Sequence, residues 1–308
     1  MSLKSLNIPV IDFVGKRKYA MIFSAILLIA SIASIGFQGL KFGIDFTGGT
    51  LIELGYEKTA DLEGIRSKLA SADFKGTNVQ YFGSDTEVLI QLEPQAASSA
   101  QISSSIIRML GEGIDVRRVE FVGPKVGEEL TNDGGLAMLY ALIGILIYVA
   151  FRFEYRFALG SIAALIHDVI ITLGVFSLLQ IEFDLTVLAA ILAVIGYSLN
   201  DTIVVFDRIR ENFLASRQVE PGSIINEALN QTLSRTLMTS LTTLLVLFAL
   251  FYLGGEVIHS FAGALLIGVV IGTYSSIYVA SSTILAMGIS KEDMLPSEKE
   301  KKEIDARP

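Results

Sequence analysis

The stretch Val194–Asn212 reads Val-Ile-Gly-Tyr-Ser-Leu-Asn-Asp-Thr-Ile-Val-Val-Phe-Asp-Arg-Ile-Arg-Glu-Asn. Its first part belongs to an apolar run, Leu185–Phe206, that is long enough to form one membrane-spanning helix. Asn200 and Asp201 lie inside that run. An Asp near the middle of such a helix costs roughly 2.5–3.5 kcal/mol on insertion scales, unless it contacts protein or water or is protonated. The stretch therefore predicts both a membrane fold and a functional carboxyl group.

The rest of the chain is also strongly apolar. Hydrophobic residues make up 52% of the 308 positions, and they fall in long blocks instead of short alternations, as in an integral membrane protein. The chain has no cysteine, which excludes disulfides, thiolate metal sites and a thiol nucleophile. Its net charge of −8, without a basic cluster, argues against a nucleic-acid partner. No nucleophile–base set or metal cluster is evident, so we expect neither an enzyme nor a bound cofactor.

Six apolar segments predict an α-helical six-span bundle, with one helix, an inserted domain and then five helices. The predicted parts are a cytoplasmic N-terminus at 1–18, the first transmembrane helix at 19–37, a periplasmic α+β domain at 38–133, transmembrane helices two to six at 134–288, and a cytoplasmic tail at 289–308. The first apolar segment is longer than the core of a typical signal peptide, so we expect an uncleaved anchor. The last is longer than one span requires and repeats small residues at Gly268, Gly272, Ser276 and Ala280, which allow another helix to approach closely.

The inserted domain has the element order β-α-β-β-α-β. The periodicity predicts strands within 46–56 and near 78–82, 87–93 and 116–122, and helices near 62–71 and 100–110. This order is that of a split βαβ, ferredoxin-like fold. Gly48 and Gly49 are not followed by a helix with a Walker lysine, so they predict a turn or bulge instead of a phosphate loop.

The distribution of Lys and Arg predicts the orientation. The segments expected in the cytoplasm carry four, two, three and five of these residues, whereas the two short turns expected outside carry none. Both termini are therefore predicted to be cytoplasmic and the domain to be outside. Within the 207–233 loop, Ser223 is expected to cap a short helix on the membrane surface. The tail Ser297–Pro308 is expected to be disordered.

Other polar residues accompany Asp201 in the predicted membrane region. His167 and Asp168 lie about halfway along the third segment, and Arg235 lies just before the fifth. An Asp201–Arg235 pair would keep the carboxylate charged, whereas separation would favour protonation, which together outline a proton-operated switch. Three structural alternatives stand beside this hypothesis: Asn200 and Asp201 clamp neighbouring helices, Arg235 only extends to the headgroups, and His167 only joins two helices.

Six motifs occur in order along the chain: Gly43-Ile44-Asp45-Phe46-Thr47-Gly48-Gly49-Thr50, Val122-Gly123-Pro124-Lys125-Val126-Gly127, His167-Asp168, Gly196-Tyr197-Ser198-Leu199-Asn200-Asp201-Thr202, Asp207-Arg208-Ile209-Arg210-Glu211-Asn212 and Ser234-Arg235-Thr236. They closely resemble the SecF family of protein-export subunits in the resistance-nodulation-division superfamily. The resemblance implies a protein of the bacterial inner membrane. Its implied partners are SecD, which completes a twelve-helix unit, the SecYEG channel, the SecA motor, YajC, YidC and the exported polypeptide.

The resemblance further implies that the proton-motive force drives movements of the periplasmic domain that promote translocation. It places Asp201 and Arg235 on the proton path, and we add Asn200 and Asp168 as predicted proton-coupling residues. Asp45, Phe46, Thr47, Gly48 and Gly49 form the motif of the periplasmic domain. The alternative function is a half-transporter that exports small molecules or lipids by proton antiport, although a domain of this size is small for a substrate pocket.

Overall fold

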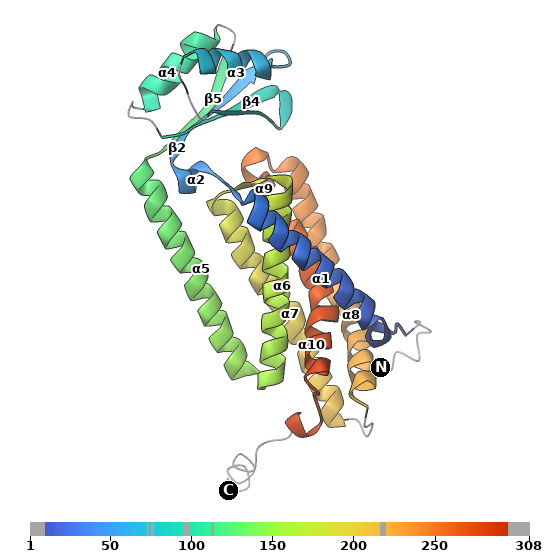
Figure 1. Ribbon diagram of the computed structural model, residues 1–308. Coiled ribbons are helices and arrows are strands. Elements are labelled where there is room, and N and C mark those ends of the chain that lie inside the picture. Colours follow the sequence, from blue (N-terminus) through green and yellow to red (C-terminus); the bar gives the residue numbers. More distant parts are fainter. Residues whose placement is uncertain are drawn as a thin grey trace, which may run out of the picture.

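The computed structural model describes residues 10–72, 74, 77–94, 99–111, 114–215 and 220–294. A bundle of long helices carries a small domain with a sheet at one end (Figure 1). In the described part of the chain, six helices are long and apolar enough to cross a membrane. The predicted fold class, one helix followed by a domain and five further helices, is therefore confirmed, whereas the exact membrane and domain boundaries remain predictions.

The bundle consists of α1, α5, α6, α7, α8 and a composite last helix. Their bounds are α1 Phe13–Gln38, α5 Pro124–Arg152, α6 Tyr155–Leu179, α7 Leu185–Ala215, α8 Pro221–Leu253, α9 Glu256–Ser275, the π-helical turn η2 Ser276–Ala280 and α10 Ser281–Ala286. About half of the most apolar window of α6 and of α7 is buried, against 11% for α5 and 17% for α8. The helices α6 and α7 therefore form the centre, and α5 and α8 leave much of their apolar surface uncovered.

The α7–α8 connection differs from the prediction. The region 207–233 was predicted to be a loop with a separate surface helix capped by Ser223, but α7 continues to Ala215 and α8 begins at Pro221. Polar residues in this region alternate with apolar residues that are buried, namely Ile209, Phe213, Ile224, Ile225, Ala228 and Leu229. Packing of these side chains extends both helices beyond their most apolar parts, so Arg235 lies inside α8 instead of before its start.

The last helix packs tightly against α7 through its small residues. A Cβ atom at Gly268 would lie 2.1 Å from Cγ2 of Val194, and one at Gly272 would lie 3.0 Å from Cβ of Ser198. The predicted close approach is therefore confirmed. Directly after this contact the helix forms the π-helical turn η2, a feature that is frequent at functional sites.

The domain has the predicted β-α-β-β-α-β order. Its elements are β2 Gly49–Tyr56, α3 Leu62–Ser71, β3 Asn78–Phe82, β4 Ser84–Leu92, α4 Ser99–Leu110 and β5 Ile114–Val122. The strands are ordered β3-β4-β2-β5 and all pairs are antiparallel, as in a ferredoxin-like fold. Both helices cover one face of the sheet and enclose a core that includes Ile52, Val88, Ile90 and Ile106.

The domain is inserted between α1 and α5, and its last strand runs directly into α5 (Figure 1). Between α1 and β2 lie β1 Lys41–Phe42 and the short helix α2 Ile44–Thr47. The strand β1 pairs in parallel with β6, Glu182–Phe183, in the turn between α6 and α7. The domain is thus connected to the bundle at both ends, through the β1–α2 segment after α1 and through the start of α5. The β1–β6 pair adds a third contact between this connection and the bundle.

Candidate functional site

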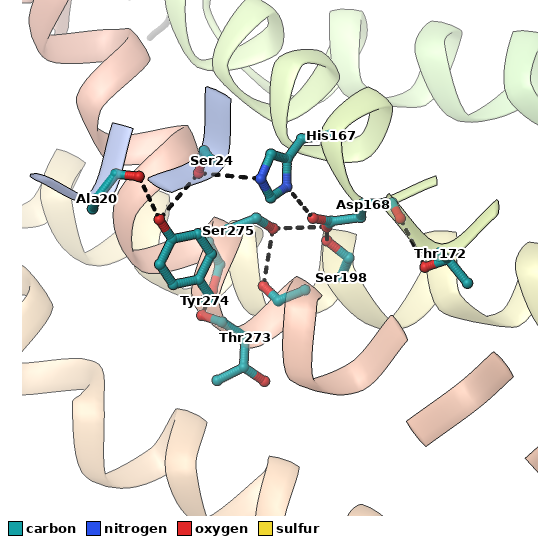
Figure 2. A network of polar contacts seen from close by, with 11 residues as sticks. Ala20, Ser24, His167, Asp168, Thr172, Ser198, Thr273, Tyr274 and Ser275 are labelled. Carbon is teal, nitrogen blue, oxygen red and sulfur yellow. Dashed lines mark hydrogen bonds and ion pairs between the residues drawn. The ribbon is translucent and has the colours of Figure 1, made fainter. Parts of the chain in front are cut away.

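A network of buried polar side chains surrounds Asp168 of α6 (Figure 2). The Asp168 side chain is completely buried. Its Oδ2 accepts hydrogen bonds from Oγ of Ser198 on α7 at 2.5 Å and from Oγ of Ser275 on α9 at 2.7 Å. Its Oδ1 lies 2.9 Å from Nδ1 of His167. The carboxyl group therefore joins three helices in the centre of the bundle, and both of its oxygens have partners.

The network continues from His167 to α1 (Figure 2). Nε2 of His167 lies 3.2 Å from Oγ of Ser24, which lies 3.0 Å from the hydroxyl of Tyr274 on α9. The Tyr274 hydroxyl donates to the carbonyl oxygen of Ala20 at 2.7 Å. His167 thus makes the helix–helix hydrogen bond that the sequence suggested as one alternative, and it is also part of a continuous chain of polar groups.

Asp201 of α7 is in a different environment. Its side chain is only 2% exposed, and its Oδ2 has no hydrogen-bond partner in the described part of the protein. The hydroxyl of the next residue, Thr202, is also buried without a partner there. Buried polar atoms without a partner are rare in native structures. One oxygen of the Asp201 carboxyl group is thus buried without a hydrogen bond, and the choice between a polar clamp and a functional carboxyl group stays a prediction.

Two polar residues of α8, Arg235 and Ser240, lie close to Asp201. The charge of Arg235 acts on the carboxyl group, and the Ser240 hydroxyl lies near it. Ser240 in turn accepts a long hydrogen bond from the Tyr197 hydroxyl, at 3.4 Å, and lies 2.7 Å from Oγ1 of Thr273 on α9. Ser275, which bonds Asp168, and Thr273, which contacts Ser240 near Asp201, thus belong to one short segment that directly precedes the π-helical turn.

The structure does not bring Arg235 and Asp201 into an ion pair. Arg235 is exposed, and no ion pair or hydrogen bond of its side chain occurs within the described residues. Asn200 is also exposed and has no side-chain hydrogen bond there, because it lies on the side of α7 that no other helix of this chain covers. The predicted proton-coupling residues therefore divide into two buried acids, Asp168 and Asp201, and two residues at the surface of the bundle.

The hydroxyl groups around the His167–Asp168 pair were not predicted from the sequence; they belong to Ser198 and Ser275, which bond Asp168, and to Ser24 and Tyr274, which continue the network from His167. Their only signal in the sequence is that they are polar residues inside apolar helices. Such residues are common in membrane helices, and nothing in the local pattern shows which of them reach the same carboxyl group.

The motif Asp45–Gly49 lies at the joint between the domain and the bundle. Oδ2 of Asp45 accepts a hydrogen bond from the backbone N–H of Leu185 at 3.1 Å, which satisfies a free donor at the start of α7. The ring of Phe46 stacks on Phe183, with 5.8 Å between the ring centroids. Phe46 and Thr47 belong to α2, so the strand begins only at Gly49.

The two glycines of this motif are required by the backbone. Gly48 ends α2 with a φ of 70°, and Gly49 starts β2 with a φ of 129°, so both occupy conformations that favour glycine. A Cβ atom at Gly49 would lie 2.2 Å from the carbonyl oxygen of Leu92. On the other side, a Cβ atom at Gly127 of α5 would lie 2.8 Å from the backbone nitrogen of Gly48. The predicted turn is confirmed, and it allows the backbones of α2 and α5 to touch.

Within the described residues, no group of three or more His, Asp or Glu side chains is arranged to hold a metal ion.

The chain matches known protein families over most of its length. The profile of the family "Protein export membrane protein SecD/SecF, C-terminal" matches residues 102–290, and the "SecD/SecF GG Motif" matches residues 33–60. The chain is 55% identical over 305 residues to the protein translocase subunit SecF of Vibrio alginolyticus, and the match covers 97% of each chain. It is 47% identical over 302 residues to SecF of Escherichia coli O157:H7, with 96% of this chain and 94% of the relative covered.

Two solved structures are similar to the fold. The SecDF crystal structure from Thermus thermophilus, a translocon-associated membrane protein, superposes with a TM-score of 0.84 and 39% identity over 93% of this chain. A SecDF crystal structure in a super-membrane-facing form gives a TM-score of 0.68 and 37% identity over 97% of this chain. This chain spans 39% and 40% of the lengths of those SecDF chains.

Proposed function

The chain belongs to the SecF family of protein-export membrane proteins, and we propose that it couples proton movement at Asp201 to movement of the sheet domain during polypeptide export. As a member of this family it is an auxiliary subunit of the Sec translocase and a multi-pass protein of the bacterial inner membrane. Its relatives are named translocase subunits and not enzymes or small-molecule exporters. Export of small molecules or lipids by proton antiport is therefore not favoured.

The observation that carries the proposal is the unsatisfied carboxyl group of Asp201. A buried carboxylate oxygen without a hydrogen bond is costly, and protonation removes most of that cost. Because Arg235 lies on the neighbouring helix and forms no ion pair with another described residue, a small displacement of α8 relative to α7 brings the guanidinium to the carboxylate and favours the charged form. Proton binding and release then accompany two arrangements of these helices.

The joint formed by α2 supports the transmission of such movements to the domain. Asp45 bonds the start of α7, the helix that carries Asp201, while α2 also touches α5 at Gly127. A shift of α7 along or about its axis therefore displaces the base of the sheet domain directly. The family motif Asp45–Gly49 acts in this proposal as a mechanical joint and not as a binding loop.

The partner in this proposal is SecD. The solved relatives are SecDF chains about two and a half times as long as the region they share with this chain, so this chain corresponds to one part of them. The exposed residues Asn200 and Arg235 lie on neighbouring membrane helices, where a second bundle would cover them. In line with the SecF family we also propose that the complex works with SecYEG, SecA, YajC and YidC on an unfolded polypeptide.

We further propose that the sheet domain is periplasmic and that both termini are cytoplasmic. The start of α1 and the end of α10 lie at the end of the bundle away from the sheet domain (Figure 1). The residues Lys16, Arg17, Arg152 and Arg156 lie at helix ends on that same side, in agreement with the distribution of positive charge.

The test is the substitution Asp201→Asn in the full chain, assembled with SecD and compared with Glu227→Gln. Asn keeps the size of the side chain but cannot ionise. Glu227 is an exposed carboxyl group on α8, so its change to an amide is a matched control. Export of a secretory precursor into inner-membrane vesicles is measured with and without an imposed proton gradient.

We expect Asp201→Asn to lose the gradient-dependent part of export and Glu227→Gln to keep it. Arg235→Lys should have a smaller effect than Asp201→Asn, since Lys keeps the positive charge but not the planar fork of hydrogen-bond donors. Gradient-stimulated export at the wild-type level from a well-assembled Asp201→Asn complex would show that Asp201 is not the coupling carboxyl.

A further inference from the structure

The hydrogen bonds around His167 determine where their protons lie. The Tyr274 hydroxyl has one proton, and the Ala20 carbonyl at 2.7 Å can only accept it. The contact of 3.0 Å between Ser24 and Tyr274 therefore requires Ser24 to donate. Because Ser24 has then used its only proton, the contact of 3.2 Å between Ser24 and Nε2 of His167 requires Nε2 to donate. His167 thus carries a proton on Nε2.

The same reasoning applies to the other side of the ring. Nδ1 of His167 and Oδ1 of Asp168 are 2.9 Å apart, so one proton lies between them. Oδ2 of Asp168 accepts a hydrogen bond from Ser198 at 2.5 Å, and the Ser275 hydroxyl is shared between Oδ2 and the carbonyl oxygen of Gly272. Either the ring is a cation beside a carboxylate, or a neutral ring accepts a hydrogen bond from a protonated carboxyl group. In both cases the pair holds one proton more than a neutral His beside an ionised Asp.

From this geometry we infer that the His167–Asp168 pair is a second proton-binding site, which controls how α1 is held against the bundle. The inference rests on the proposed proton coupling and extends it to a site outside the Asp201 environment. When the pair releases one proton to water, a neutral ring and a carboxylate remain. The proton between Nδ1 and Oδ1 stays on Nδ1, because a bare Nδ1 would face the carboxylate, and the proton that leaves is the one on Nε2. Nε2 then becomes an acceptor.

This change reverses the direction of the hydrogen bond between His167 and Ser24. Ser24 must now donate its proton to Nε2, so it can no longer donate to Tyr274. Tyr274 must either donate to Ser24 and leave the Ala20 carbonyl without its proton, or keep that bond and lose the one to Ser24. In either case one hydrogen bond between α1 and α9 is lost. Because α1 runs directly into β1 and α2, a loosened α1 changes the support of the sheet domain.

The surroundings of the pair are otherwise low in charge. The titratable groups that face it from neighbouring elements are Tyr274 on α9, Tyr278 on η2, which packs against the ring of Tyr274, and Asp201, one turn along α7 from Ser198. Among the described residues, α1, α5 and α10 provide no ionisable side chain that hydrogen-bonds to the pair. Proton release there leaves a buried negative charge near Asp201, so each of the two sites opposes ionisation of the other.

The experiment uses the protonation state of the ring itself. The chain has two histidines, so selective 15N labelling of the full chain in lipid nanodiscs, with His259→Gln for assignment, isolates the two ring nitrogens of His167. The nitrogen shifts distinguish a cation, the Nε2–H form and the Nδ1–H form. We expect a proton on Nε2 at neutral pH, and conversion to the Nδ1–H form as the pH rises. An Nδ1–H form with a bare Nε2 throughout, from acidic to alkaline pH, would overturn the inference.

Two variants sharpen this measurement. In Asp168→Asn the side-chain amide donates permanently to Nδ1, so we expect the Nε2–H form at every pH. In Ser177→Ala two other polar contacts between α6 and α1 are lost, the 2.9 Å contact with Ser34 and the 2.7 Å hydrogen bond to the carbonyl oxygen of Gly39, while the chain of hydroxyl groups is untouched. This control should therefore titrate as the wild type does. A pH-driven change to the Nδ1–H form in Asp168→Asn would contradict the proposed role of the carboxyl group.

The coupling to α1 is measured by electron paramagnetic resonance. The chain has no cysteine, so spin labels at Tyr19→Cys on α1 and Tyr155→Cys on α6 report only on these two exposed positions. The distance distribution should broaden or shift over the same pH range as the ring signal in the wild type, but not in Asp168→Asn. A constant distribution across the ring transition would refute the control of α1. Neither measurement involves export, so their failure would leave the Asp201 test unaffected.

Discussion

The two buried acids should contribute differently to the stability of the bundle and to function. Asp168 has hydrogen bonds to both oxygens from three side chains, whereas Oδ2 of Asp201 has none within the described residues. We predict that Asp168→Ala strongly destabilises the bundle and that Asp201→Asn leaves its stability almost unchanged, although Asp201 is the residue expected to be essential for coupling. Stability and function are thus expected to separate at these two positions.

The magnitudes follow from the contacts. Hydrogen bonds between membrane helices contribute about 0.6 kcal/mol on average and at most about 1.7 kcal/mol, so the bonds from Ser198 and Ser275 together account for about 1–3 kcal/mol. Removal of one partner from a buried pair costs about 3–5 kcal/mol, which applies to the His167 contact. We therefore expect Asp168→Ala to cost at least about 3 kcal/mol. Asp168→Asn and Asp201→Asn should each stay within about 1 kcal/mol of the wild type, since an amide can bond in place of each carboxyl group.

The free energy of unfolding can be measured by equilibrium unfolding in mixtures of SDS and mild detergent, followed by circular dichroism. Ser177→Ala, which removes the contact with the Ser34 hydroxyl and the hydrogen bond to the Gly39 carbonyl oxygen, provides the scale for two hydrogen bonds between α6 and the end of α1. The reasoning is refuted if Asp168→Ala unfolds at the same SDS fraction as Ser177→Ala. It is also refuted if Asp201→Asn is less stable than Asp168→Ala.

Three further predictions concern the joint, its electrostatics and the orientation. Gly127→Ala should destabilise the chain by about 1–3 kcal/mol in SDS unfolding, because its Cβ would press on the backbone of Gly48, whereas Gly135→Ala, with open space around its Cβ, should be neutral. Burial raises the pKa of Glu182 above its usual value, so this carboxyl group binds a proton more tightly in the folded protein than in the unfolded chain. The free energy of unfolding therefore falls as the pH rises from the ordinary carboxyl range through the raised pKa. Glu182→Gln should therefore flatten this part of the pH–stability curve and stabilise the chain at neutral pH, while Glu63→Gln, at an exposed site, should not. In intact spheroplasts, a cysteine in place of Ser84 should react with an impermeant thiol reagent and one in place of Glu220 should not; labelling of the Glu220 position alone would invert the topology.

The sequence alone determined the architecture, because the features that specify it are local. A membrane span requires about 20 consecutive apolar residues, and a strand or a helix shows its own short periodicity. The six spans, the βαββαβ order of the domain and the close helix contact at Gly268 and Gly272 could all be predicted for this reason. The predicted tail Ser297–Pro308 lies outside the described residues.

Tertiary structure decided the extent of α7 and α8 and the environment of each polar group in the bundle. The polar region 207–233 looked like a loop, but Phe213, Ile224 and other apolar residues there pack against the bundle and keep both helices intact. Asp168 and Asp201 look alike in the sequence, each an acid inside an apolar segment. Only the packing of α1, α7 and α9 around α6 brings hydroxyl groups to Asp168 from positions far apart in the chain, and only the placement of α8 leaves Arg235 apart from Asp201. Such contacts depend on how whole helices are placed against one another, and no local pattern of residues contains that information.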